Sequence, residues 1–209
     1  MSGRGTGAAR RIVLATRNPG KLAELARILA ASGAEVAVAG LDEFPGAPEV
    51  TETGRTFAEN ALLKARSAAA FTGLAAVADD SGLCVDALNG MPGVLSARWA
   101  GRQGDDQANL DLVLAQLRDV AEPDRGAHFR CAAALVLPSG TERVTEGRLY
   151  GRLARAPRGT NGFGYDPIFL PDSADLTTAE MDPAAKDAIS HRGRALRALA
   201  PVIAELLPG

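Results

Sequence analysis

Two adjacent carboxylates, Asp79 and Asp80, are the side chains of this sequence best placed to do chemistry. They follow an apolar run at residues 74–78 that predicts a small buried strand, and Ser81 and Gly82 come directly after them. Ligands of open α/β sheets bind beyond the carboxyl ends of the strands. We therefore expect this acidic pair at the end of a strand and in a ligand site.

The chemistry that such a pair suits is the binding of Mg²⁺, which takes one or two carboxylates together with substrate phosphates. Neighbouring side chains of an extended chain point to opposite sides, so only one of Asp79 and Asp80 should face the cleft directly. An aspartate in a turn or at a helix cap is an equally good explanation on local grounds.

The loop at residues 16–21 lies between a predicted strand at 11–15 and a predicted helix. Backbone N–H groups at a helix start attract anions, and a lysine adds positive charge, so this arrangement is typical of a phosphate site. It is not a Walker A loop, because Leu22 follows Lys21 where that motif has Ser or Thr. The alternative is an ordinary turn with a solvated lysine. The loop consists of Thr16, Arg17, Asn18, Pro19, Gly20 and Lys21.

Glu59 has two competing explanations. It lies three residues after Thr56, which is the spacing of a capping box, and this pattern alone accounts for it. A carboxylate at a helix start could instead reach the same metal ion as the acidic pair. The capping role is favoured on local grounds.

Residues 162–167 set Phe163 and Tyr165 among glycines. Glycine permits close approach of the backbone to a ligand, and either aromatic ring could stack on a nucleobase. The commoner alternative is a turn whose aromatic rings seal the core.

Residues 190–193 contain three residues that are unfavourable at the start of a helix. Ser190 is a good N-cap, but His191 and Arg192 then fall in the first turn, where the helix dipole disfavours cations. Gly193 adds a further cost to the helix. Together they indicate a recognition site, with Lys186 shortly before it.

The elements that must position these groups alternate along the first half of the chain. Apolar patterning predicts strands at 11–15, 35–39 and 74–78, and helices after residue 21, from 56 to about 71 and from about 105 to 117. A hairpin of strands 129–137 and 142–153 follows, then a loop at 155–171, a short helix at 178–181 and a last helix from Ser190 that Pro201 should kink. The pattern favours an α/β protein with a mixed sheet.

Composition excludes several classes of protein. The 209 residues carry a formal net charge of −2, which argues against a nucleic-acid binder that works through bulk positive charge. No apolar run has the length of a membrane span. Residues 1–11 lack the apolar stretch of a secretory signal, so we expect them not to be one. The 2 cysteines favour a reduced, cytoplasmic protein. We expect residues 1–10 to be a disordered tail and residues 11–209 to form a single domain.

Taken in order, these motifs resemble the non-standard purine nucleoside triphosphate pyrophosphatases, the inosine triphosphatase family. The resemblance covers residues 12 to about 199 and its ordered set of motifs is highly specific. The segments that carry it are 14–21, 56–61 with Lys64 and Ala65, 78–83, 92–94, 96–98, 162–167 and 190–193.

The resemblance implies an elongated mixed sheet with flanking helices, in two lobes around a central nucleotide cleft, and a homodimer that requires Mg²⁺. It implies cleavage of ITP, dITP or XTP to the monophosphate and pyrophosphate. Residues 16–21 would bind the triphosphate, Asp80 would be proton acceptor and metal ligand, Glu59 a further metal ligand, and Ser81 a substrate contact. The base pocket would contain Phe163, Gly164, Tyr165, Asp166, Lys186, His191 and Arg192.

Base selection should depend on the 6-position of the purine. Inosine and xanthosine carry an acceptor oxygen there and adenosine a donor amino group, so a donor such as Arg192 would favour the former. Guanine shares the oxygen, and the sequence does not indicate how it is excluded. Two alternatives stay open, a Maf-like nucleotide pyrophosphatase and a non-catalytic nucleotide sensor. A sensor would not need Asp79, Asp80 and Glu59 to converge on a metal.

Overall fold

The structure is a computed structural model that describes residues 10–33 and 36–207. The predicted tail falls on residues 1–9, outside the described residues, except that Arg10 already begins the first strand, β1 (Arg10–Leu14). No helix in the described part of the chain has the length and apolar character that a membrane span needs.

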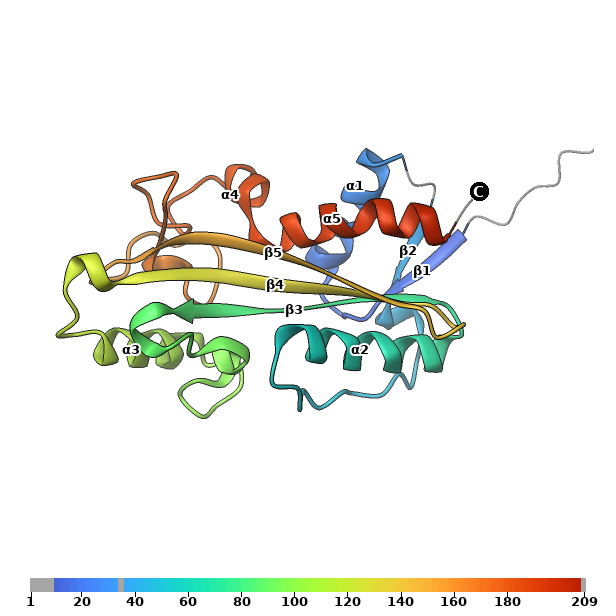
Figure 1. The fold of residues 1–209 in the computed structure, drawn as a ribbon, viewed down its shortest axis with the longest axis horizontal. Helices are drawn as coiled ribbons and strands as arrows, with labels where there is room; N and C mark the ends of the chain where they lie inside the picture. The colour runs from blue at the N-terminus through green and yellow to red at the C-terminus, as the bar shows by residue number, and fades with distance from the viewer. Residues whose placement is uncertain (1–9, 34–35, 208–209) are drawn as a thin grey trace, which may run out of the picture.

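A six-stranded sheet in the order β2-β1-β3-β4-β5-β6 forms the centre of the molecule. β1 pairs in parallel with β2 (Val36–Gly40) and with β3 (Ala75–Val85), whereas the later pairs are antiparallel. β4 (Gly126–Val136) and β5 (Glu142–Leu153) form the predicted hairpin, and the short β6 (Phe169–Pro171) closes the edge. The predicted mixed sheet is confirmed, and it is long and narrow (Figure 1).

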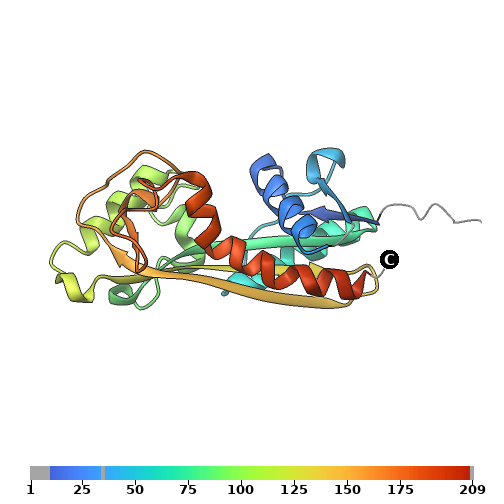
Figure 2. The ribbon, with the colours of Figure 1, turned by 90° about the horizontal axis from the view of Figure 1, so that it is seen from above.

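Helices cover both faces of this sheet. α1 (Pro19–Ala31) and α5 (His191–Leu206) pack with one face of β1, β3 and β4, while α2 (Phe57–Thr72) packs on the other. α3 (Asp106–Gln116) and the short α4 (Pro183–Ile189) lie toward the opposite end of the sheet from α1 (Figure 1). Seen from above, α5 runs along the long axis of the sheet (Figure 2). β3 therefore lies between α1 and α5 on one face of the sheet and α2 on the other.

The main error of the sequence prediction concerns β3. We expected a strand at 74–78 with the acidic pair beyond its end, but β3 continues through Asp79 and Asp80 to Val85. β1 pairs only with Ala75–Val77 of β3, and the extension is held by its ten-residue register with β4, from Ala76 to Val85. The acidic pair thus lies beyond the carboxyl end of β1 rather than of its own strand.

Two smaller differences lie in the last third of the chain. The predicted helix at 178–181 is a turn, and α4 begins instead at Pro183 with Asp182 as its N-cap. β6 was not predicted, because three residues are too few to show an alternating pattern. The last helix does begin after Ser190, and it continues through Pro201.

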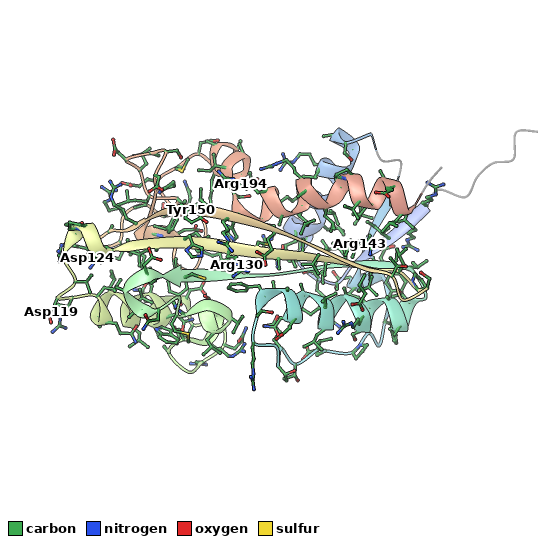
Figure 3. The ribbon with its side chains drawn as sticks, in the orientation of Figure 1. Asp119, Asp124, Arg130, Arg143, Tyr150 and Arg194 are labelled. Atoms are coloured by element: carbon green, nitrogen blue, oxygen red, sulfur yellow. The ribbon has the colours of Figure 1, made fainter. Side chains whose placement is uncertain are left out.

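Gly147 of β5 allows the start of α5 to approach the sheet closely. A Cβ atom on Gly147 would lie 2.1 Å from the carbonyl oxygen of His191 and 2.6 Å from the amide nitrogen of Ala195. Thr145 Oγ1 donates to the Ala195 carbonyl at 2.8 Å, and Arg194, beside β5 in Figure 3, donates to the Arg148 carbonyl at 2.6 Å. These contacts fix the helix that carries His191 and Arg192.

We predict that Gly147→Ala lowers the free energy of unfolding by about 1–3 kcal/mol, because backbone atoms of α5 must move away from the new methyl group. Gly40→Ala is the matched control, since its Cβ would meet its nearest atom at an ordinary 3.5 Å. Denaturant unfolding of both variants measures the difference. Equal stability of the two would show that α5 does not depend on this approach.

Candidate active site

Two cavities contain most of the predicted site residues, one beside α2 and the other beside the start of α5. The α2-side cavity has a volume of about 650 Å³ and is lined by residues that include Thr16, Arg17, Glu52, Lys64 and Arg98. The α5-side cavity has a volume of about 200 Å³; its lining includes Glu24, Ser81, Asn109, Phe129, Phe163, Gly164, Tyr165, Asp166, Lys186, His191 and Arg192. Most of the predicted site residues therefore gather in two adjoining places.

Asp79 points to the α5 side. Its Oδ2 atom accepts hydrogen bonds from Lys21 Nζ at 2.9 Å and from Arg192 Nε at 3.0 Å, and its side chain is 4% exposed. Burial alone would raise the pKa of Asp79, but the two cations outweigh it and hold that pKa well below its usual range. Asp79 is therefore a permanent anion that ties α1 and α5 to the strand.

Asp80 points to the α2 side, as the alternation of side chains along a strand requires. Its carboxylate accepts from Asn60 Nδ2 at 3.1 Å and from Lys64 Nζ at 3.2 Å. Burial raises the pKa of Asp80, against the opposing effect of the Lys64 cation. Lys64 also donates to Glu52 Oε1 at 2.7 Å, so one ammonium group lies between two carboxylates.

Asn60, Lys64 and Glu52 were given no role by the sequence analysis. Asn60 and Lys64 are four residues apart on α2, so they lie on one face of that helix. This spacing was the one available signal for that pair. No local pattern links Glu52, in the loop before α2, to a partner elsewhere.

Glu59 performs the capping role. Thr56 Oγ1 accepts from the Glu59 N–H at 3.1 Å, and Glu59 Oε2 accepts from the Arg55 N–H at 2.6 Å. Over the described residues, no three His, Cys, Asp or Glu side chains form a group that could hold a metal ion. Asp79 and Asp80 lie on opposite faces of β3, as the alternation of side chains predicted. The roles of Asp80 and Glu59 as metal ligands stay predictions.

The loop at residues 16–21 carries a strong helix cap. Asn18 Oδ1 accepts from the N–H groups of Gly20 and Lys21, and Pro19 occupies the first turn of α1. The helix N–H groups that we expected to meet an anion are thus already bonded within the loop. Thr16 and Arg17 line the α2-side cavity, and Lys21 reaches Asp79 on the other side.

The aromatic residues Tyr165 and Phe163 of the α5-side cavity differ in their exposure to solvent. Tyr165 is buried and its hydroxyl donates to the Ser96 carbonyl at 2.8 Å, whereas Phe163 is 70% exposed. Asp166 accepts from Lys186 Nζ at 2.6 Å and from the Phe163 N–H at 2.8 Å, and the Lys186 ammonium lies 5.6 Å from the centre of the Phe163 ring. Phe163 is therefore the ring free to stack on a ligand.

His191 stacks on Phe129, with ring centres 4.9 Å apart and an angle of 14° between the planes. Burial lowers the pKa of His191 to about 3, and the neighbouring Arg192 cation adds to the effect. The imidazole is consequently neutral at pH 7. Arg192 itself is held by Asp79, with Glu24 Oε2 3.9 Å from its Nη1 atom.

Comparison with known proteins places this arrangement in a family. The model of the Ham1 family matches residues 12–202. The chain belongs to the Ham1 family. This confirms the resemblance drawn from the motifs.

Two relatives in the family are named dITP/XTP pyrophosphatase. The protein of Streptomyces coelicolor is 64% identical over 94% of this chain and 98% of its own length. The protein of Nocardia farcinica is 61% identical over 94% of this chain and 96% of its own length.

Solved structures of the family confirm the fold. A structure titled nucleoside-triphosphatase / dITP/XTP pyrophosphatase from Mycobacterium abscessus has 59% identity and a TM-score of 0.79, covering 92% of this chain and 99% of that one. A HAM1 protein from Coxiella burnetii has 46% identity and a TM-score of 0.86, covering 94% of this chain and 99% of that one. The elongated sheet with flanking helices is thus the fold of the family.

The low pKa of His191 predicts a pH dependence of stability. An unfolded histidine has a pKa near 6.5, so the unfolded chain takes up this proton first and stability falls as the pH drops from about 6.5 toward 3. We predict that His191→Phe, which keeps a ring on Phe129, flattens the curve of unfolding free energy in this window, by up to about 1.4 kcal/mol per pH unit. Curves of the same slope for the wild type and the variant would contradict the lowered pKa of His191.

Proposed function

We propose that this protein hydrolyses the non-standard purine nucleoside triphosphates ITP, dITP and XTP to the monophosphate and pyrophosphate, and so keeps them out of DNA and RNA. The observation that carries the proposal is the pair of carboxylates on opposite faces of β3. Asp80 is bonded to Lys64, which lines the α2-side cavity, and Asp79 is bonded to Arg192, which lines the α5-side cavity. The α2-side cavity offers cationic and hydroxyl groups suited to phosphates, and the α5-side cavity offers an exposed aromatic ring suited to a base. The names of the relatives support the same activity.

Asp80 is the proton acceptor of the proposed reaction. Water attacks the α-phosphorus, its proton passes to the Asp80 carboxylate, and pyrophosphate leaves. The hydrogen bonds from Asn60 and Lys64 hold this carboxylate in place, and its raised pKa makes it a stronger base than an ordinary aspartate. Thr16, Arg17 and Lys64 offset the negative charge of the phosphates in the α2-side cavity.

Asp80 and Glu52 are the side chains that would hold a Mg²⁺ ion. The Lys64 ammonium contacts both, at 3.2 and 2.7 Å, so the two carboxylates are close enough to share one positive charge. Two carboxylates suit an ion that also takes substrate phosphates and water. When bound, the ion neutralises phosphate charge and orients the leaving pyrophosphate. Glu59, the ligand suggested by the motifs, is the alternative to Glu52.

The base would enter the α5-side cavity, with Phe163 stacking on it and Ser81, Gly164, Tyr165, Asp166, Lys186 and His191 around it. Lys21, held at Asp79 next to Arg192, would meet the phosphate chain. The homodimer and the cytoplasmic location stay predictions.

A pyrophosphate-release assay with Mg²⁺ and a panel of triphosphates tests the proposal. We expect release from ITP, dITP and XTP and little from ATP, GTP or the pyrimidine triphosphates. Faster release from a pyrimidine triphosphate would favour a Maf-like enzyme. Tight binding without release would favour a sensor.

We predict that Asp80→Asn folds normally and loses activity by about 10²–10⁴-fold, because the amide cannot accept the proton. The measurement is kcat with ITP at saturating Mg²⁺, alongside the melting temperature. A near-normal kcat would remove Asp80 from the role of base.

Glu52→Gln and Glu59→Gln separate the two candidate metal ligands. Both changes are nearly isosteric and remove one negative charge. We predict that Glu52→Gln raises the Mg²⁺ concentration needed for half-maximal activity more than Glu59→Gln does, because Glu59 is exposed and bonded to the Arg55 N–H. A larger shift in Glu59→Gln would restore that residue as the ligand.

A further inference from the structure

The segment at residues 92–98 carries part of the resemblance to the family, yet none of its residues has a role in the proposed reaction. Most of it forms the short 3₁₀ helix η3 (Gly93–Arg98), which packs on β3. The last residue of this helix, Arg98, lines the α2-side cavity. The segment therefore brings a cation to the cavity that contains the proposed base.

The packing of η3 on β3 leaves no room for adjustment. A Cβ atom on Gly82 would lie 2.4 Å from the Gly93 carbonyl oxygen and 2.4 Å from Ser96 Oγ. Ser96 Oγ accepts from the Leu83 N–H at 2.9 Å and donates to the Gly93 carbonyl at 2.6 Å. These contacts fix the backbone that carries Arg98 before any ligand binds, which lowers the cost of ordering it in a complex.

The guanidinium group of Arg98 reaches the carboxylate that Lys64 also binds. Its Nη1 atom lies 3.7 Å from Glu52 Oε2, and its Nη2 atom donates to the Glu52 carbonyl at 3.4 Å. Lys64 Nζ donates to the other carboxylate oxygen, Oε1, at 2.7 Å. Because Glu52 and Lys64 also line the α2-side cavity, the charged end of Arg98 lies at this cavity as well.

Arg98 is held more loosely than three other cations of the site. Lys21, Lys64 and Arg192 approach a carboxylate oxygen to 2.9, 2.7 and 3.0 Å. The corresponding contact of Arg98 is 3.7 Å, which is too long for a hydrogen bond, and its side chain is 31% exposed. Arg98 therefore gives up little when an anion takes its N–H groups.

The proposed reaction decides which phosphates meet Arg98, and this step rests on the proposed function. Attack on the α-phosphorus places that atom next to Asp80, and the pyrophosphate leaves roughly in line on the other side. Lys64 contacts Asp80 at 3.2 Å and Glu52 through Oε1, whereas Arg98 lies at Oε2 of Glu52. Arg98 is thus further along this chain of contacts from the base, where the end of the triphosphate lies.

We propose that Arg98 binds the β- and γ-phosphates and stabilises the pyrophosphate as it leaves. Water attacks the α-phosphorus and its proton passes to Asp80. The bond from the α-phosphorus to the oxygen that bridges to the β-phosphorus breaks, and its electron pair stays on that oxygen. The planar N–H groups of the guanidinium fit two phosphate oxygens and offset the charge that the pyrophosphate gains. Arg98 transfers no proton.

Arg98→Gln tests the proposal, because it removes the charge and keeps a polar side chain. The measurement is the Kd of inorganic pyrophosphate and of IMP by calorimetry, without Mg²⁺, so that a metal ion cannot contribute. We expect pyrophosphate to bind about tenfold more weakly or worse, and IMP to bind as to the wild type. Arg98→Lys should fall between the two proteins, since it keeps the charge and loses the planar fork.

Arg66→Gln is the matched control. It removes the same charge from the outer side of α2, where Arg66 is exposed and pairs with Glu142 at 2.6 Å. A loss that came from the net charge of the protein would appear equally in both variants. The affinity for pyrophosphate should stay at the wild-type value in Arg66→Gln.

A double variant with Glu52→Gln separates a direct contact from an effect through Glu52. If Arg98 only orients or neutralises that carboxylate, its removal must abolish the effect of Arg98→Gln on pyrophosphate. We expect the loss of pyrophosphate affinity to persist in the double variant. Its disappearance would overturn the proposal and leave Arg98 as a support for Glu52.

Equal weakening of pyrophosphate and IMP in Arg98→Gln would also overturn the proposal. So would an unchanged affinity for pyrophosphate, or a wild type that hydrolyses ITP without binding pyrophosphate. Each of these results, with ITP hydrolysis by the wild type, leaves the proposed function standing. A wild-type protein that neither hydrolyses ITP nor binds IMP would instead overturn the proposed function.

Discussion

The alternation of side chains along one strand determines how the site is built. Because β3 stays extended through Asp79 and Asp80, two consecutive carboxylates must emerge on opposite faces of the sheet. One face is covered by α1 and α5 and the other by α2. Asp79 therefore meets a cation from α1 and another from α5, whereas Asp80 meets a single cation from α2. A turn at this position, as the sequence suggested, would have placed both in the same loop. The long strand instead separates the two carboxylates onto opposite faces of the sheet.

The two faces give the two aspartates different chemistry. Asp79 contacts Lys21 and Arg192, and these two cations hold its pKa well below its usual range despite its burial. Asp80 meets one cation that it shares with Glu52, and burial raises its pKa. Carboxylates whose environments move their pKa values apart commonly divide structural and proton-transfer roles between them. Asp79 is thus suited to holding α1 and α5 together, and Asp80 to accepting a proton.

The sequence predicted the elements whose signals are local, and it failed where the decisive contacts are distant. The capping box at Thr56, the cap at Ser190 and the hairpin of β4 and β5 all depend on neighbouring residues. The extension of β3 does not, since Asp-Asp-Ser-Gly has the composition of a turn and is held extended by its register with β4. Glu52 and Asn60 are joined to Asp80 only by folding.

The cations of this site should add less to the affinity for phosphates than their number suggests. Lys21, Arg192 and Lys64 already have carboxylate partners, so a phosphate gains their attraction only by competing with Asp79, Asp80 or Glu52. Such exchange limits the net affinity gained from charge, because one ion pair replaces another.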